Sequence, residues 1–230
     1  VVMFSMEMPR DQVVARLVSL TSHIHLSKLK RADRLSDFDW TALSNSSEIL
    51  HRMPIRISDA SGLTITQLRA RARALRRRNP DLALLVVDYL GLMRGTDPKM
   101  PRVYQLEEIT TGLKAIAKEL RLTVALLAQV SRKVEERSDQ MPMLSDLRDS
   151  GSIEQDADIV IFVHREHKAK PNLGDEWKYH AKASVAKVRD GEPGLLDLMY
   201  VGENTRFMDW PADMQVPTSR ARMANKGDDL

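Results

Sequence analysis

Short apolar runs alternate with longer amphipathic stretches along the chain, a pattern typical of strands that alternate with helices. The run LALLVVDYLGLM at 82–93 is the strongest strand signal, because it is apolar on both faces, as in the middle of a parallel sheet. Shorter strands are predicted at 1–5, 54–59, 122–129 and 159–164. The chain therefore carries enough strands for one extended sheet.

Helices are predicted between these strands. Residues 103–121 place apolar side chains at three- and four-residue steps, which indicates an amphipathic helix. Pro9 suits the first turn of a helix after the first strand, and Ser36 is a suitable N-cap for a helix over 36–52. The segment 64–79 opens with T-x-x-Q, the pattern of a capping box.

This alternation predicts βαβ units, and hence an α/β fold with a mostly parallel sheet flanked by helices. Two strands around the turn GEPG and a last strand at 206–210 predict a C-terminal antiparallel β-meander at one edge of that sheet. Residues 130–150 form a polar gap, and long loops in compact domains are usually functional or disordered. We expect one domain over 1–211 and a polar, disordered tail over 212–230.

The composition excludes several classes of protein. The absence of cysteine rules out disulfides and thiolate chemistry and is typical of a reducing compartment such as the cytoplasm. The sequence has no run of the roughly 18 apolar residues that a membrane span needs, and its scattered histidines show no metal-binding spacing. Because the chain starts at Val1, inside a predicted strand, we expect it to lack its true N-terminus.

The formal net charge is only +3, but the charges are unevenly distributed. The run RARARALRRR at 69–78 is dense in arginine. A solvated helix face is the more common origin of such a run, and a nucleic-acid surface is the alternative. A second charged run, SDLRDSGSIEQDAD at 145–158, directly precedes the apolar strand predicted at 159–164.

Polar side chains follow three predicted strands at their carboxyl ends, where ligands bind in open α/β sheets. They are Glu7, Asp88 and Gln129. The segment LLVVD, which ends at Asp88, has the Walker B pattern of phosphate-loop NTPases, whose aspartate holds Mg²⁺, usually through water. Each residue alone also has a structural explanation, as a strand or turn cap or as an acid at a helix N-terminus. Together they predict the catalytic edge of a RecA-like ATPase, in which a glutamate is the general base.

The glycine-rich phosphate loop of such ATPases, G-x-x-x-x-G-K-[ST], occurs nowhere in the 230 residues. Without its lysine and main-chain amides, these residues alone are expected to bind ATP very weakly and not to hydrolyse it. A non-catalytic module that binds DNA or a partner subunit therefore stays open as an alternative.

Six segments, in this order, resemble the motifs of the C-terminal motor domain of the DnaB-type replicative helicases. They are FSMEMP (4–9), LLVVDYLGLM (84–93), LKAIAKEL (113–120), LLAQVSR (126–132), SDLRDSGSIEQDADIVIFVHR (145–165) and AKVRDG (186–191). The resemblance covers roughly residues 1–210, and DLRDSGSIEQDAD is its most specific part. The sequence departs from the family pattern at Asp149, where Glu is more frequent, at Gly91, where Gln is common, and in the turn RDG after the basic pair.

The resemblance implies a hexameric, ATP-driven 5′→3′ DNA helicase that acts in replication, uses ATP and Mg²⁺, and translocates on single-stranded DNA. It also implies primase and a helicase loader as partners. Glu7 corresponds to the catalytic glutamate, Asp88 to the Walker B aspartate at the metal, and Gln129 to the sensor of the γ-phosphate. A RecA- or RadA-type ATPase that acts on DNA without unwinding it is the alternative enzyme.

The resemblance also implies roles for a basic pair near the C-terminus and for a loop that contains an arginine and a glycine. Lys187 and Arg189 match a pair that reaches into the ATP site of the neighbouring subunit, and an exposed hairpin pair is their structural alternative. Arg148, Asp149 and Gly151 match the loop that grips the phosphates of single-stranded DNA. Such contacts carry no base information, so DNA binding is expected to tolerate any sequence and to weaken with salt.

Overall fold

The computed structural model describes residues 1–218, apart from the side chains of Ala32 and of residues 148–150. The strands are β1 (Val2–Ser5), β2 (Arg56–Ser58), β3 (Leu84–Asp88), β4 (Thr123–Leu126), β5 (Ile159–His164), β6 (His180–Val188), β7 (Gly194–Val201) and β8 (Arg206–Asp209). The α-helices are α1 (Arg10–Ser22), α2 (Leu26–Leu29), α3 (Asp37–Arg52), α4 (Ile65–Arg78), α5 (Arg102–Leu120), α6 (Gly151–Asp156) and α7 (Glu166–Ala169). Short 3₁₀ helices are η1 (Ala32–Arg34), η2 (Leu90–Leu92), η3 (Arg132–Glu136), η4 (Leu144–Ser150), η5 (Asp175–Trp177) and η6 (Gly202–Asn204). Residues 219–230 of the predicted tail lie outside this description.

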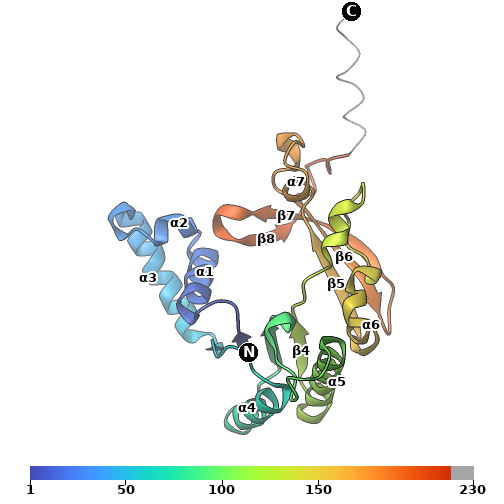
Figure 1. The fold of residues 1–230 in the computed structure, drawn as a ribbon. Coiled ribbons are helices and arrows are strands. Elements are labelled where there is room, and N and C mark those ends of the chain that lie inside the picture. The colour runs from blue at the N-terminus through green and yellow to red at the C-terminus, as the bar shows by residue number, and fades with distance from the viewer. Residues whose placement is uncertain (219–230) are drawn as a thin grey trace, which may run out of the picture.

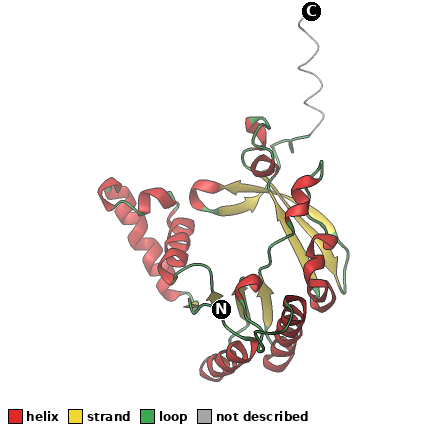
Figure 2. Cartoon of the chain, viewed as in Figure 1, coloured by secondary structure: helices red, strands yellow, loops and turns green. Residues whose placement is uncertain are grey.

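The first four strands form a parallel sheet, as the sequence predicts, and their order is β2-β1-β3-β4. Figures 1 and 2 show this part of the fold with helices α4 and α5 beside it. Helices α4 and α5 pack against this sheet through side chains that are fully buried, among them Leu68 of α4 and Ile116 of α5. Their partners on the central strands include Phe4 and Leu85. Leu85 and Val87 of β3 are buried on one face of the sheet, whereas Leu84 and Val86 on the other face are half-buried.

The remaining strands form a second, antiparallel sheet in the order β5-β6-β7-β8. The predicted meander is therefore confirmed, but it joins β5 rather than an edge of the parallel sheet. Strand β5 pairs with β6 from Ile159 opposite Val188 to His164 opposite Lys182, with a shift of register between Val160 and Ile161. Val160 and Phe162 of β5 belong to the same apolar core as the parallel sheet, which joins the two sheets.

Helices α1, α2 and α3 form an arm between β1 and β2 that projects to one side of the parallel sheet (Figure 1). Two predicted helix starts are confirmed in this region and beyond it: Ser36 caps α3, and Thr64 forms a capping box with Gln67 at α4. Asp39 of α3 accepts hydrogen bonds from Lys28 and Ser36, which lower its pKa to about 2. The described residues contain no helix both long and apolar enough to cross a membrane.

The arginine run lies on α4, and its side chains bind groups of the same chain. Arg73 pairs with Glu119 of α5, Arg69 lies 3.8 Å from the same carboxylate, and Arg76 donates to the carbonyl of Leu82 at 2.6 Å. These contacts favour the solvated helix face over the nucleic-acid surface.

We expect Phe4→Ala to lower the free energy of unfolding by about 3–5 kcal/mol, because it empties the centre of the parallel sheet. Phe4 is 1% exposed, and its strand pairs with a neighbour on each side. Urea denaturation measures the change. Phe38→Ala on α3 is the matched control, since that ring is 82% exposed and its loss should stay within about 0.5 kcal/mol. Equal losses for the two variants would contradict the described core.

Candidate functional site

Glu7 and Asp88 lie at the carboxyl ends of adjacent parallel strands. In the register of β1 and β3, Ser5 stands opposite Asp88, and Glu7 follows two residues later. The amide of Met6 donates to the main-chain carbonyl of Asp88 at 2.7 Å, which extends the pairing past the last strand residue. The structure thus brings together the two carboxylates that the sequence singles out.

A tight turn holds Glu7 at the surface beside this edge. The buried hydroxyl of Ser5 donates to the carbonyl of Met8 at 2.8 Å, and the Met6 side chain is buried in the core. Glu7, between these anchored residues, is exposed. The chain then turns directly into α1, whose first amide, that of Arg10, donates to Asp59 at 3.1 Å. The position of the Glu7 backbone is therefore fixed from both sides.

The electrostatics of Asp88 indicate a site that can accept a cation. Burial raises the pKa of Asp88, the charge of Glu7 raises it further, and Arg16 of α1 opposes the shift. Asp88 is half-buried, and within the described residues its carboxylate makes no side-chain hydrogen bond. A divalent cation would relieve the repulsion between the two carboxylates. The carboxylates of Asp88 and Glu7 are therefore suitable ligands for Mg²⁺. Sequence reasoning missed Arg16, because no motif in the sequence points to it.

Gln129 lies just beyond the next strand of the same sheet. The amide of Leu127 donates to the carbonyl of Val87 at 2.9 Å, and the amide of Leu90 donates to the carbonyl of Leu127 at 2.9 Å. Both hydrogen bonds join the residues that follow the carboxyl end of β4 to those at the carboxyl end of β3. Gln129 follows two residues later and is exposed. The amide side chain therefore stands at the same edge as Glu7 and Asp88.

Gly91 is the position where the sequence departs from the family pattern after DYL. A Cβ added there would come within 2.5 Å of the ring of Tyr89. The Tyr89 ring therefore occupies the space beside Gly91 that a larger side chain would need.

Lys187 and Arg189 lie at the end of β6 and bind groups of their own chain. The Lys187 ammonium donates to the carbonyl of Glu154 at 2.5 Å, and the Arg189 guanidinium lies 3.2 Å from the carboxylate of Asp158. Lys114 of α5 binds the same carboxylate, and these cations lower the pKa of Asp158. Among the described contacts, none joins Lys187 or Arg189 to the three side chains at the parallel-sheet edge.

The predicted DNA-binding loop spans η4 and the start of α6. Gly151 begins α6, and an added Cβ there would meet nothing within 4 Å, so its backbone is openly accessible. The side chains of Arg148 and Asp149 lie outside the described residues. The loop is anchored on both sides, because Leu147 and Ile153 are buried in the core.

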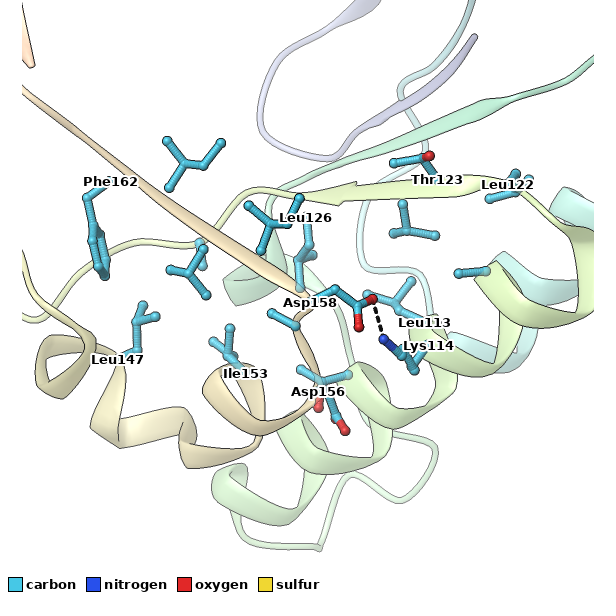
Figure 3. Close-up of a pocket in the computed structure, with 18 of the residues that line it drawn as sticks. Leu113, Lys114, Leu122, Thr123, Leu126, Leu147, Ile153, Asp156, Asp158 and Phe162 are labelled. Carbon is cyan, nitrogen blue, oxygen red and sulfur yellow. Dashed lines mark hydrogen bonds and ion pairs between the residues drawn. The ribbon is translucent and has the colours of Figure 1, made fainter. Parts of the chain in front are cut away.

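A cavity of about 500 Å³ separates the edge strands β4 and β5 of the two sheets (Figure 3). Its walls are mostly aliphatic or aromatic, with Leu126 on β4, Phe162 on β5 and Leu113 on α5. Lys114 and Asp158 form an ion pair at its rim (Figure 3). Each edge strand has a neighbour on one side only, so the cavity lies between two rows of unpaired main-chain groups.

Comparison with known proteins gives a consistent result. The family described as "DnaB-like helicase C terminal domain" matches residues 1–209. The replicative DNA helicase DnaB of Rickettsia typhi is 42% identical over 89% of this chain, and that of Pasteurella multocida is 39% identical over 90%. Each match covers 44% of the relative, so the chain spans less than half the length of these proteins.

Solved structures agree with these matches. A DnaB-like replicative helicase, described with its interactions with primase, superposes with a TM-score of 0.86 and 33% identity over 91% of this chain and 50% of the other. A second solved structure, described as an ATPase domain, gives the same TM-score and identity over 91% of this chain and 74% of the other.

Proposed function

The chain belongs to the family of DnaB-like helicase C-terminal domains, and we propose that residues 1–211 are the ATP-hydrolysing motor of a hexameric replicative DNA helicase. One observation carries the proposal: Glu7, Asp88 and Gln129 stand at the carboxyl ends of three adjacent parallel strands. A general base, a metal-binding carboxylate and an amide at one sheet edge are the groups that hydrolysis of a nucleoside triphosphate requires.

In this proposal each of the three side chains has a separate role in ATP hydrolysis. Glu7 is exposed and accepts a proton from the attacking water. Asp88 would hold Mg²⁺, and that metal would supply positive charge to neutralise the β- and γ-phosphates. Gln129 donates its amide to the γ-phosphate or to the water and so reports which nucleotide is bound. Burial of Asp88 strengthens its interaction with any cation, because less solvent screens the charges.

We assign Lys187 and Arg189 to the ATP site of a neighbouring subunit. Their described contacts lie with Glu154 and Asp158 of their own chain, away from Glu7 and Asp88. An arginine that acts across a subunit interface stabilises charge that develops on the transferred phosphoryl group. Arg189 would exchange its exposed ion pair with Asp158 for the nucleotide, which costs little because such pairs contribute at most about 1 kcal/mol.

We place the phosphate loop in polypeptide outside these 230 residues, since the relatives are more than twice as long as the matched segment. The cavity between β4 and β5 has the apolar walls and the unpaired edges that an inserted strand would need. A strand there would join the two sheets into one and would bring its carboxyl end to the edge that holds Asp88.

The proposed motor acts on single-stranded DNA through Arg148, Asp149 and Gly151, and it works with primase and a helicase loader. An accessible glycine backbone suits contact with phosphates rather than bases. ATP hydrolysis in successive subunits would then move the loops along one strand in the 5′→3′ direction.

Strand displacement tests this function. We expect the full-length protein to separate a forked duplex with a 5′ single-stranded tail when ATP and Mg²⁺ are present, and to leave a fork with only a 3′ tail intact. Gel electrophoresis of a labelled strand measures the product. DNA-stimulated ATP turnover without displacement would favour a RecA- or RadA-type ATPase. DNA binding without ATP turnover would favour the non-catalytic module.

A further inference from the structure

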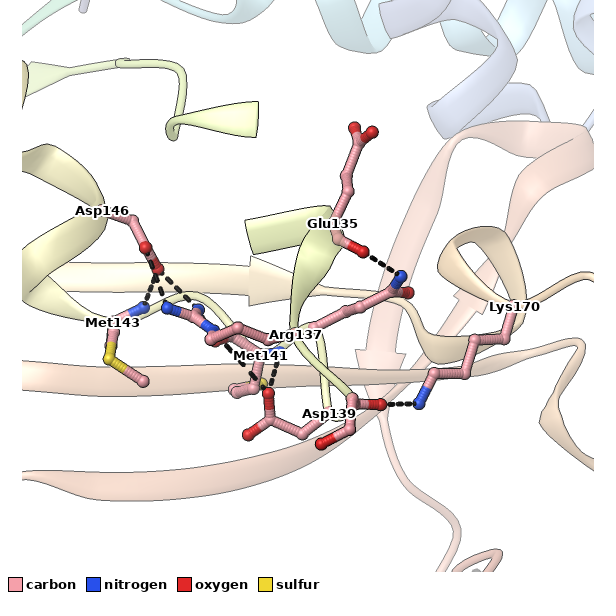
Figure 4. Close-up of polar contacts among 9 residues, drawn as sticks. Glu135, Arg137, Asp139, Met141, Met143, Asp146 and Lys170 are labelled. Carbon is pink, nitrogen blue, oxygen red and sulfur yellow. Dashed lines mark hydrogen bonds and ion pairs between the residues drawn. The ribbon is translucent and has the colours of Figure 1, made fainter. Parts of the chain in front are cut away.

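The carboxylate of Asp146 is the centre of a polar network at the base of the DNA-binding loop (Figure 4). Its side chain is only 6% exposed and accepts three hydrogen bonds. The guanidinium of Arg137 donates two of them, at 2.9 and 2.7 Å, and the amide of Met143 donates the third at 2.8 Å. A two-pronged Arg–carboxylate pair of this kind fixes both distance and orientation.

Arg137 ties further parts of the same segment together. One of its terminal nitrogens also donates to the carbonyl of Met141 at 2.5 Å, and its Nε lies 3.8 Å from Asp139. The hydrogen bonds from Arg137 strongly favour the charged form of Asp146, so the pKa of that carboxyl lies below its usual range. The segment from 137 to 146 is thus closed into a compact loop by one guanidinium.

The main chain of Asp146 is bound as well. The amide of Ser131 donates to the carbonyl of Asp146 at 3.1 Å. Ser131 comes two residues after Gln129, and Asp146 comes two residues before Arg148. One hydrogen bond therefore links the segment that carries the predicted phosphate sensor to the segment that carries the predicted DNA contact. The side chain and the main chain of Asp146 therefore both stabilise the contact between these two segments.

We propose that Arg137 and Asp146 form a positioning clamp that fixes residues 148–151 in the orientation needed to bind single-stranded DNA. The inference rests on the proposed function, because it needs that loop to contact DNA. Neither residue would touch the DNA itself. A loop held within a narrow range of positions binds its ligand without a further loss of backbone freedom.

The clamp is tested in the full-length protein with Arg137→Lys and Asp146→Asn. Lysine keeps the charge but cannot make the two-pronged contact, and asparagine keeps the shape but loses the charge. Fluorescence anisotropy with labelled oligothymidylate measures the Kd. We expect each variant to bind DNA about tenfold more weakly. We expect the double variant to be no weaker than the single ones, because the two side chains act as one unit.

Two further variants separate the clamp from a general loss of stability. Asp39→Asn removes a paired carboxylate from the helical arm, far along the chain from the loop, and should leave the DNA Kd unchanged. Arg148→Ala removes the proposed DNA contact itself and should weaken binding. Thermal unfolding is recorded for every variant, and all Kd values are measured well below the lowest Tm.

Each outcome has one meaning. If Arg148→Ala weakens binding and the clamp variants do not, the clamp is wrong and the proposed function stands. If Asp39→Asn weakens binding as much as the clamp variants do, their effect is loss of stability and the clamp is also wrong. If the unchanged protein does not bind oligothymidylate, the proposed DNA function and the clamp both fail.

Discussion

Replacing Glu7 by glutamine lowers ATP turnover by about 10²–10⁴-fold, the usual contribution of a general base, and leaves nucleotide binding in place. Glutamine has the same shape, but it cannot accept a proton from water at neutral pH. Glu7 makes none of the described side-chain hydrogen bonds and is exposed, so the fold does not depend on it. Steady-state turnover and equilibrium ATP binding by the full-length protein separate the two effects.

The matched control for this variant is Glu48→Gln on α3. Glu48 is also an exposed glutamate in the N-terminal half of the chain, but it pairs with Arg52 on its own helix, away from the sheet edge. Its turnover should equal that of the unchanged protein. Turnover of Glu7→Gln within a factor of about two of the control would remove Glu7 from the mechanism and leave Asp88 as the remaining carboxylate at this edge.

Replacing Arg189 by alanine lowers ATP turnover by about 10³-fold or more, the lower end of the range for an arginine that stabilises phosphoryl transfer. Stability should change little, because Arg189 and Asp158 are both about half exposed, at 51% and 54%. Arg73→Ala is the control, since this arginine is 53% exposed and binds Glu119 in a comparable ion pair on the outer helices. A similar turnover for both variants would contradict a catalytic role for Arg189.

Mixing the two inactive variants tests whether Arg189 acts across an interface. An assembly that contains both Glu7→Gln and Arg189→Ala subunits includes some sites with an intact Glu7 from one subunit and an intact Arg189 from its neighbour. Turnover should therefore recover in the mixture. If Arg189 acted on the nucleotide of its own chain, no site in the mixture would be complete, and turnover would stay at the level of the separate variants.

Local patterns predict much of this fold because they report local physics. The capping box at Thr64 and the apolar run that becomes β3 depend on neighbours within a few residues, and the structure has both. The edge that gathers Glu7 and Asp88 was also predictable, because parallel strands must end on the same side. The sequence pattern thus predicts where a residue lies when the direction of its strand is enough to place it.

Contacts between distant segments were not visible in the pattern. The pattern of apolar residues at 159–164 predicts a strand, but it does not predict that β5 pairs with β6 rather than with β4. The partners of Arg189 and the pairing of Arg137 with Asp146 depend on how loops fold back, and no spacing rule governs those distances. The segment 130–150, which the pattern describes only as a polar loop, contains the 3₁₀ helices η3 and η4.

The strands that border the cavity also bear on how the polypeptide behaves before it is fully assembled. Ile159, Ile161 and Val163 alternate along β5 and are each more than half exposed, beside a row of unpaired amides and carbonyls. An apolar, β-branched edge of this kind is a template for pairing with other chains. Isolated copies of these 230 residues are therefore expected to aggregate through this edge, and a strand paired with β5 would remove the tendency.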